Sequence, residues 1–420
     1  MKKTGILFIA LLTVLPLTAQ EETKFGISWS GFVKNDFFFD SRQTVSAREG
    51  HFLLWPAAVN EDLDGEDINE KANFNFLAIQ SRLKAAISGP DAFGAKTSGV
   101  IETDFFAQAN DNINLLRLRH AFVKFDWTKV ELLAGQYWNP LFVTECFPGT
   151  VSFNTGAPLQ SFARNPQVRL SIKASNFRFM AAALSQRDYT SRGEDGVSSA
   201  YLRNSATPDM HLQAMYSSVD PQSNTGFVAG AGLAYKTIVP RLENAFGPVS
   251  LFKVDEKVGG LSAIGFLKLQ TTPLTMKAQL RYGENLADVL AISGFAVKEV
   301  VDNLTGEQSY TPLRSMSFWG EIHTNGSKIQ AGLFGGFSRN MGTKDEMSSP
   351  GNDVYGLATD ISFLYRISPR IIINSGKARL ALELEYTSAS YGSDYNTNYI
   401  PSTTSTVNNL RALLAVYYFF

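Results

Sequence analysis

The last twelve residues, Asn409-Leu-Arg-Ala-Leu-Leu-Ala-Val-Tyr-Tyr-Phe-Phe420, decide the fold. In an extended strand, alternate side chains point to opposite faces. One face of this segment is wholly apolar and carries Leu410, Ala412, Leu414, Val416, Tyr418 and Phe420. The other face begins with Asn409 and Arg411. A strand with one apolar face and aromatic residues at its end is typical of the lipid-exposed wall of a transmembrane β-barrel.

The same alternation recurs upstream and extends the prediction to the whole chain. Charged side chains gather on one face and apolar side chains on the other in segments 101–105, 116–122, 168–173, 274–282 and 379–386. In segment 116–122 the apolar face is predicted to carry Leu116, Leu118 and Phe122, with His120 as a polar exception. A soluble β-sandwich would alternate too, but a chain of this length built from sandwiches should contain domain linkers, and none is visible.

Short and long connections also alternate along the chain. Asn325-Gly326 is a strong hairpin signal, whereas long polar stretches occur near residues 40–72, 187–208 and 391–406. Barrels combine tight turns at one end with long loops at the other. The sequence therefore predicts an all-β fold, an antiparallel up-and-down transmembrane β-barrel of about 16 strands, with 18 left open. Within it, Asn285 to Asp302 is predicted to form a short helix in an outer loop, because its apolar residues lie along one side.

The N-terminus and the composition set the context. Lys2 and Lys3 precede an apolar run and a small residue at Ala19, which predicts a signal peptide over 1–19 and a barrel over 20–420. The localisation expected from both is the outer membrane of a Gram-negative cell, with its lipid as a partner. A net charge of −1 gives no support for nucleic-acid binding. The single cysteine, Cys146, excludes an internal disulfide.

The chemistry is expected on the charged, inward face. Its basic candidates are Lys34, Arg82, Lys84, Arg117, Arg119, Arg164 and Arg169, together with Lys173. Its acidic candidates are Asp36, Glu102 and Asp104. Because Glu102 and Asp104 belong to a strand between two basic strands, we expect an acidic row flanked by two basic rows. Such rows would create a field that favours anions, since arginine binds carboxylates with two hydrogen bonds. The charges could equally pair with one another and simply solvate the wall.

The segment 139–163 is a candidate constriction loop. It contains several prolines and glycines with Phe142, Phe147 and Phe153, and it follows the fifth predicted strand. Long loops of this kind are commonly functional. We expect it to fold into the lumen and set the pore size; an outward-facing surface loop is the alternative.

Several stretches together resemble the DcaP-like porins. They are residues 31–36 (Gly-Phe-Val-Lys-Asn-Asp), 101–106 (Ile-Glu-Thr-Asp-Phe-Phe), 116–121 (Leu-Arg-Leu-Arg-His-Ala), 135–138 (Gly-Gln-Tyr-Trp) and 164–169 (Arg-Asn-Pro-Gln-Val-Arg). The resemblance implies a homotrimeric outer-membrane channel for dicarboxylates and related organic anions. Members of that family can carry an N-terminal helical coiled coil, for which the stretch from Gln20 to Ile27 leaves no room.

These observations predict a porin, a passive diffusion channel for small polar or anionic solutes, rather than an enzyme. Two alternatives stay open: a structural or adhesive surface barrel with a plugged lumen, and an outer-membrane phospholipase-type enzyme. The enzyme would need a serine beside one of the four histidines, and no such pair can be argued. Neither metal-ligand spacing nor a phosphate-binding glycine loop is visible, so no cofactor is expected.

Overall fold

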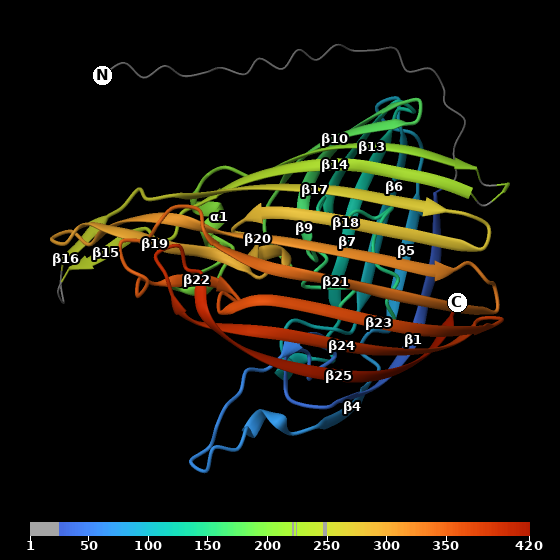
Figure 1. The fold of residues 1–420 in the computed structure, drawn as a ribbon. Helices are drawn as coiled ribbons and strands as arrows, with labels where there is room; N and C mark the ends of the chain where they lie inside the picture. The colour runs from blue at the N-terminus through green and yellow to red at the C-terminus, as the bar shows by residue number, and fades with distance from the viewer. Residues whose placement is uncertain (1–24, 221, 224, 247–249) are drawn as a thin grey trace, which may run out of the picture.

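The computed structural model describes residues 25–220, 222–223, 225–246 and 250–420; the expected signal peptide lies outside them. One large antiparallel sheet closes on itself into a transmembrane β-barrel of sixteen strands (Figure 1). Each ring strand pairs with the next along the chain, so the topology is up-and-down, as the alternation predicts. Among the described residues, the helices are too short to cross a membrane.

The ring strands are β1 (Gly26–Asp40), β4 (Asn73–Leu77) with β5 (Arg82–Ser88), β6 (Lys96–Asp104), β7 (Arg117–Asp126), β8 (Val130–Trp138), β9 (Arg164–Ala174), β10 (Phe177–Leu184), β13 (Asp209–Asp220), β14 (Thr225–Ile238), β17 (Val258–Gln270), β18 (Leu274–Glu284), β20 (Glu307–Thr324), β21 (Ile329–Thr343), β23 (Ile361–Ser375), β24 (Ala378–Tyr395) and β25 (Pro401–Phe419). Both β4 and β5 pair with β1, so they are two halves of one ring strand.

The connections contain the remaining elements. They are β2 (Thr44–Ala47), β3 (Phe52–Pro56), β11 (Arg192–Gly193), β12 (Gly196–Val197), β15 (Glu243–Phe246), β16 (Ser250–Lys253), β19 (Ser293–Asp302), β22 (Val354–Leu357), α1 (Ala200–Asn204) and the 3-10 turns η1 (Ile68–Glu70), η2 (Asn110–Asn112) and η3 (Ala287–Val289).

The C-terminal strand closes the ring against the first strand. The register of β1 and β25 runs from Phe32 opposite Phe419 to Asp40 opposite Arg411. Phe420 and Gly31 exchange two backbone hydrogen bonds of 3.2 Å beyond this register. The faces of β25 are segregated as its alternation predicts: Leu410 is 44% exposed on the outside, whereas Arg411 is 1% exposed on the inside.

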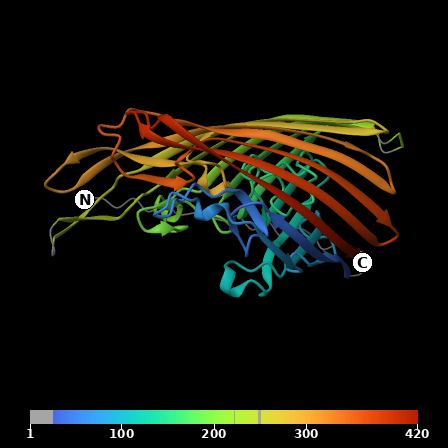
Figure 2. The same ribbon diagram turned by 60° about the horizontal axis from the view of Figure 1, so that its bottom comes forward.

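The wall is uneven in height. Strands β5 to β10 have 7 to 11 residues each and form what we call the short wall. Strands β20, β21, β23, β24 and β25 have 15 to 19 residues each and form the tall wall. The turned view shows blue-to-green connections lying beneath the arch of the yellow-to-red strands (Figure 2).

A β-bulge corrects one assignment made from the alternation. In β7, Leu118 lies opposite Thr103 while His120 lies opposite Glu102, so Arg119 is an extra residue on its strand. A bulge reverses the alternation beyond it. Phe122 was expected on the outer face with Leu118, but it packs against the inward ring of Tyr137 at 5.0 Å. His120 is buried rather than on the outer face, with its ring 5.3 Å from that of Tyr137.

The predicted helix between Asn285 and Asp302 is wrong. Only the single turn η3 forms, and the chain then continues as β19, which pairs with β20 and β22. The apolar residues 286 and 289–292 that suggested a helix are instead buried inside the barrel. The long loop expected over 391–406 is also wrong, because β24 and β25 extend through most of it.

Candidate functional site

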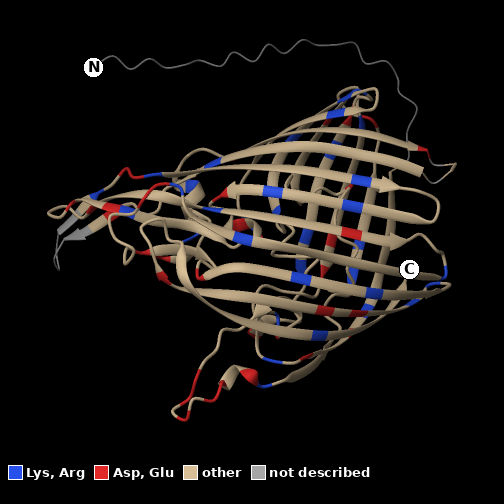
Figure 3. Cartoon of the chain, viewed as in Figure 1, with Lys and Arg blue, Asp and Glu red and all other residues tan. Residues whose placement is uncertain are grey.

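Charged residues occur along the ring strands themselves, not only in the connections (Figure 3). Strand β6 lies between β5 and β7 and presents Glu102 and Asp104 inward. Arg119 binds both carboxylates, at 2.7 Å from Glu102 Oε1 and 2.8 Å from Asp104 Oδ2. Arg117 holds Asp104 through two hydrogen bonds of 3.1 Å, and Arg82 approaches Glu102 at 3.6 Å. The acidic row therefore lies between two basic rows.

Arg164 joins this group through a residue that the alternation does not reveal. Its guanidinium donates to Asp188 Oδ2 at 2.6 and 2.9 Å, and Asp188 also lies 3.9 Å from Arg117. Burial alone would raise the pKa of Asp188, but Arg164 and Arg117 outweigh it, and the pKa is lowered from 3.8. Asp188 therefore stays ionised and links Arg117 on β7 to Arg164 on β9.

We call Arg48, Arg82, Arg117, Arg119 and Arg164 the arginine cluster. Arg48 comes from the turn after β2. Burial lowers the pKa of its guanidinium group, and so does repulsion by Arg117, whereas attraction by Tyr189 and Asp188 raises it; the net effect is a lowered pKa. Three carboxylates face these five guanidinium groups: Glu102, Asp104 and Asp188. The cluster keeps a surplus of positive charge, and Nη1 of the buried Arg164 has no hydrogen-bond partner among the described residues.

Aromatic rings hold the guanidinium planes in place. Arg117 lies 5.0 Å from the Phe106 ring, and Arg119 lies 5.9 Å from the Phe153 ring. Arg164 lies 4.9 Å from the Trp138 ring. Stacking on an aromatic face attracts a cation without neutralising it, so these contacts fix the arginines and leave their charge available.

The other predicted site residues lie outside the cluster. Lys34 and Asp36 pair with each other at 2.9 Å, and His51 contacts Asp36 at 2.8 Å. Lys84 is half-buried on β5 and forms no ion pair within the described ranges. Arg169 stacks on Tyr137 at 5.1 Å and donates to neutral oxygens of Gln167 and Trp138. Lys173 pairs with Asp126 and Glu131 near a turn.

The segment 139–163, which we call the inserted loop, crosses the barrel from the ends of β8 and β9 to the opposite strands. Gln279 on β18 donates to the Leu141 carbonyl at 3.1 Å. Arg281, on the same strand, donates to Ser161 Oγ at 2.8 Å and to the Pro158 carbonyl at 3.2 Å. These contacts place most of the loop inside the ring rather than on the outer surface.

Carboxylates of the tall wall anchor the loop tip. Glu383 accepts hydrogen bonds from the backbone N–H groups of Val151 at 2.6 Å and Ser152 at 3.2 Å. Glu385 accepts from the Asn154 side chain at 2.8 Å, and Glu321 accepts from the Gly149 N–H group. Glu321, Glu383 and Glu385 are at most 5% exposed, so each hydrogen bond forms in a largely water-free environment.

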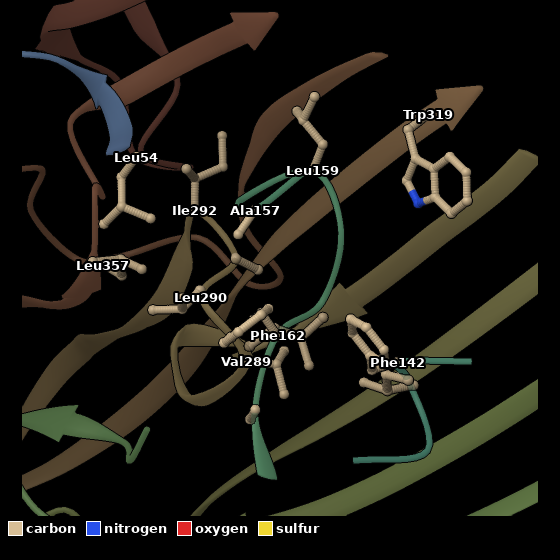
Figure 4. Close-up of a cluster of buried hydrophobic side chains, with 14 of the residues drawn as sticks. Leu54, Phe142, Ala157, Leu159, Phe162, Val289, Leu290, Ile292, Trp319 and Leu357 are labelled. Atoms are coloured by element: carbon tan, nitrogen blue, oxygen red, sulfur yellow. The ribbon is translucent and has the colours of Figure 1, made fainter. Parts of the chain in front are cut away.

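Apolar packing joins the inserted loop to two other connections (Figure 4). Phe142, Leu159 and Phe162 lie among residues of the segment that was predicted to be helical, including Val289 and Leu290. The Phe162 N–H group donates to the Val289 carbonyl at 3.0 Å. Phe52, Leu54 and Trp55 belong to the same cluster, so three connections pack together within the ring.

Sequence reasoning missed several residues of this arrangement. Asp188, Arg48 and His51 belong to connections, where no alternation indicates which way a side chain points. Arg366 was detectable, because it alternates with apolar residues on β23, yet its partners were not: it donates to the carbonyls of Ala157 and Leu54 at 2.9 and 2.6 Å.

The cysteine and two of the histidines are other potentially reactive side chains, and each contacts a neighbouring polar group. Burial raises the pKa of the Cys146 thiol to about 11, and the thiol contacts the Leu267 carbonyl at 3.2 Å. His323 contacts Glu321 at 2.7 Å, and His211 lies 3.1 Å from Asp209. Across the described ranges, no group of three or more histidine, cysteine or acidic residues could hold a metal ion.

Comparison with solved structures supports the fold. The outer membrane channel DcaP of Acinetobacter baumannii superposes with a TM-score of 0.67 at 16% identity, over 96% of this chain and 99% of that one. OmpT, an outer membrane protein of Vibrio cholerae, superposes with a TM-score of 0.54 at 9% identity, over 96% and 100%. Its trimer form gives 0.52 at 8% identity, over 94% and 99%. The expected similarity to the DcaP fold is confirmed.

Two further comparisons found nothing: no family model and no curated protein matches this sequence.

Proposed function

We propose that this chain is an outer-membrane porin, a passive diffusion channel for small polar solutes that favours organic anions such as dicarboxylates. The observation that carries the proposal is the closed ring of sixteen strands with charged groups inside and apolar groups outside. A ring of this size encloses an aqueous space when its inner face is polar. The channel and outer membrane proteins that share the fold support the same reading.

The anion preference rests on the arginine cluster. Its five guanidinium groups outnumber the three carboxylates that face them, and each of the five lies over an aromatic ring. Clustered charge of one sign raises the local concentration of the opposite ion. We assign the pore-lining role to the candidates named from the sequence: Arg82, Arg117, Arg119, Arg164, Arg169, Lys34, Lys84, Glu102, Asp104 and Asp36.

The inserted loop would narrow the pore in this proposal. It crosses the ring and is anchored to the tall wall, so the free cross-section would lie between the loop and the short wall. Phe153 of the loop lies 5.9 Å from Arg117 and from Arg119, so the loop reaches the arginine cluster and the free cross-section would lie beside this contact. A solute passing there would experience the field of the surplus cations mainly through the half-buried Arg48 and Arg82, because the other three arginines of the cluster are at most 5% exposed.

The remaining parts of the proposal concern location and assembly. We infer export by the signal peptide 1–19, insertion in the outer membrane with its lipid as solvent, and a homotrimer. A trimer form exists for one protein of this fold. The short wall would suit contact between copies, since its strands expose small residues such as Gly99 and Ala121 beside bulkier ones.

Single-channel recording in a planar lipid bilayer tests the proposal. We expect stepwise conductance and, under a salt gradient, a reversal potential of the sign that indicates anion selectivity. Purified, folded protein that never conducts would refute the channel, and cation selectivity would refute the assigned preference.

One observation favours a second candidate, a structural or adhesive surface barrel with a closed lumen. An apolar cluster occupies part of the ring. It joins the inserted loop to Phe52, Leu54 and Trp55 and to residues 286, 287 and 289–292. A barrel filled in this way would give no conductance, and its long loops would carry the function. The same recording therefore separates the two candidates.

A further inference from the structure

Two arginines of the ring point outward, away from the lumen. On β20, Ser315 and Ser317 are buried inside, so Arg314 faces outward with Met316 and Phe318. On β21, Ser338 is buried inside, so Arg339 faces outward with Phe337. Within the described residues of the ring strands, every other lysine and arginine belongs to the inward face, as the alternation of burial along each strand shows.

These two arginines are neighbours. Arg339 lies opposite Met316 in the pairing of β20 with β21, and Arg314 lies two residues further along β20. Diagonal neighbours of this kind are within reach of long side chains. Two cations placed side by side on a largely apolar surface repel each other, so their position favours a ligand of opposite charge.

Their own protein offers them few acceptors. Arg314 donates through Nη2 to the carbonyls of Met341 and Thr343 at 3.2 and 2.8 Å, while its buried Nε has no partner among the described residues. Arg339 is exposed and takes part in no ion pair within the described ranges. Glu284, which lies opposite Arg314 on β18, is already paired with Lys344 at 3.2 Å.

An outward row of aromatic side chains marks the level of the pair in the membrane. Phe318, Phe337 and Phe363 follow one another at centroid distances of 6.3 and 5.9 Å. The row continues through Tyr365 to Tyr386 at 6.1 and 6.0 Å. Arg339 lies one step beyond Phe337 and directly opposite Phe363. Aromatic girdles of barrels sit at the boundary between hydrocarbon and headgroups.

The number of residues along β21 independently places the two arginines at the same depth in the membrane. Arg339 follows Ile329, the first residue of β21 after the Asn325-Gly326 turn, by ten positions. Ten positions span ~33 Å along a strand, or ~23 Å across the membrane at a 45° tilt. The apolar band of a barrel is ~25 Å tall. Both guanidinium groups therefore lie where lipid phosphates lie, in the leaflet on the long-loop side.

We propose that Arg314 and Arg339 form a docking site for the phosphate headgroup of an outer-leaflet lipid, whose acyl chains cover the aromatic row. The planar fork of arginine matches phosphate oxygens with two parallel hydrogen bonds. This inference rests on the proposed outer-membrane placement, because that placement decides which leaflet faces the pair. It is independent of whether the lumen conducts.

The test uses the full-length protein, reconstituted in phosphatidylcholine vesicles with and without diphosphorylated lipid A, then extracted and weighed by native mass spectrometry. We expect the wild type to retain lipid A and the Arg314→Gln/Arg339→Gln variant to retain about tenfold less, as for the loss of one charge-assisted hydrogen bond. Arg339→Lys should fall between them, because it keeps charge and loses the fork. Lys253→Gln, which removes an exposed cation from β16, should match the wild type.

Two results would overturn the inference. One is equal retention of lipid A by the wild type and by the double variant, each shown to be folded by its heat-dependent shift in gel mobility. The other is full displacement of the lipid by millimolar inorganic phosphate, which would indicate a site for soluble anions. Conductance recorded on the wild type and on the double variant keeps the questions apart: a wild-type barrel that is silent yet retains lipid A, while the double variant loses it, refutes the proposed channel and leaves the docking site standing.

Discussion

The short wall and the tall wall follow the same alternation, yet their inward charges have different partners. On the short wall, Glu102 and Asp104 bind arginines of the neighbouring strands. On the tall wall, Glu383 and Glu385 bind the backbone and side chains of the inserted loop. Alternation therefore fixes which residues face inward, whereas the partner of each inward charge depends on what else occupies the lumen.

Removing the loop anchors should produce the largest effect. The substitution Glu383→Ala leaves the Val151 and Ser152 N–H groups without their acceptor, at a cost of about 1–3 kcal/mol for each, and Glu385→Ala removes an acceptor of the Asn154 side chain. We expect the loop to leave the tall wall and single-channel conductance to rise.

The matched control for the anchors is Glu346→Ala, which removes an exposed carboxylate beyond the end of β21. Its conductance should equal that of the wild type. Unaltered conductance in the double variant would show that the inserted loop does not limit the pore.

The seam between β1 and β25 provides the next largest effect. A Cβ atom at Gly31 would lie 2.1 Å from the Arg82 carbonyl oxygen, which belongs to the backbone of the neighbouring strand β5 and cannot turn away, and 2.8 Å from the Phe420 ring at the seam. Gly31→Ala should therefore destabilise the barrel by about 1–3 kcal/mol, the usual cost of overpacking. The temperature at which the folded band is lost on a gel measures this.

Gly265→Ala, on β17, is the control for the seam, because no atom lies within 4 Å of the added Cβ. It should melt close to the wild type. Equal melting of both variants would mean that the seam tolerates the extra atom.

Removing arginines from the arginine cluster should have a smaller effect, which is measured as a change in ion selectivity. Arg117→Gln with Arg119→Gln removes two cations from the short wall, and we expect the anion-to-cation permeability ratio to fall by about tenfold. Adding Asp104→Asn avoids leaving a buried carboxylate without its partners. Reversal potentials under a salt gradient measure the ratio.

Lys173→Gln, at the end of β9 near the turn, removes one cation outside the cluster and should leave the ratio near that of the wild type. If this variant and the cluster variant reduce the ratio equally, net lumen charge rather than the cluster sets selectivity.

The smallest expected effect is a change in how the melting temperature depends on pH, and it arises from the ionisation of Asp188. Its pKa in the folded protein lies below 3.8, so the unfolded chain binds its proton first as the solution is acidified. The stabilisation by Arg164 and Arg117 is therefore complete near neutral pH and is lost as the pH falls through the folded pKa. Melting temperatures from pH 7 to pH 3 should fall less steeply in Asp188→Asn; parallel curves would contradict this.

The sequence predicts the ring well, for a physical reason. A barrel wall has lipid on one side and polar groups on the other, so every strand repeats one pattern with a period of two. Segments 274–282 and 379–386 follow it without interruption, and their strands appear as expected. Where a single extra residue enters, at Arg119, the period breaks and Phe122 is assigned to the wrong face.

The connections could not be predicted in the same way. Residues 286–292 form an apolar group that resembles a helix face, but they are buried against the inserted loop instead of against a helix partner. Asp188 has no periodic neighbours at all, so its place between Arg164 and Arg117 follows only from the three-dimensional arrangement. Local patterns cannot report which distant segment fills a lumen.

The unequal heights of the wall have a consequence for what the cell displays. Strand β25 has 19 residues, which rise ~45 Å at a 45° tilt and so exceed the ~25 Å apolar band, whereas β8 has 9. One side of the barrel wall therefore extends beyond the membrane surface, and the opposite side ends near that surface. Antibodies and bacteriophages that approach from outside would meet the raised flank first, so variation selected by them should concentrate on its upper half.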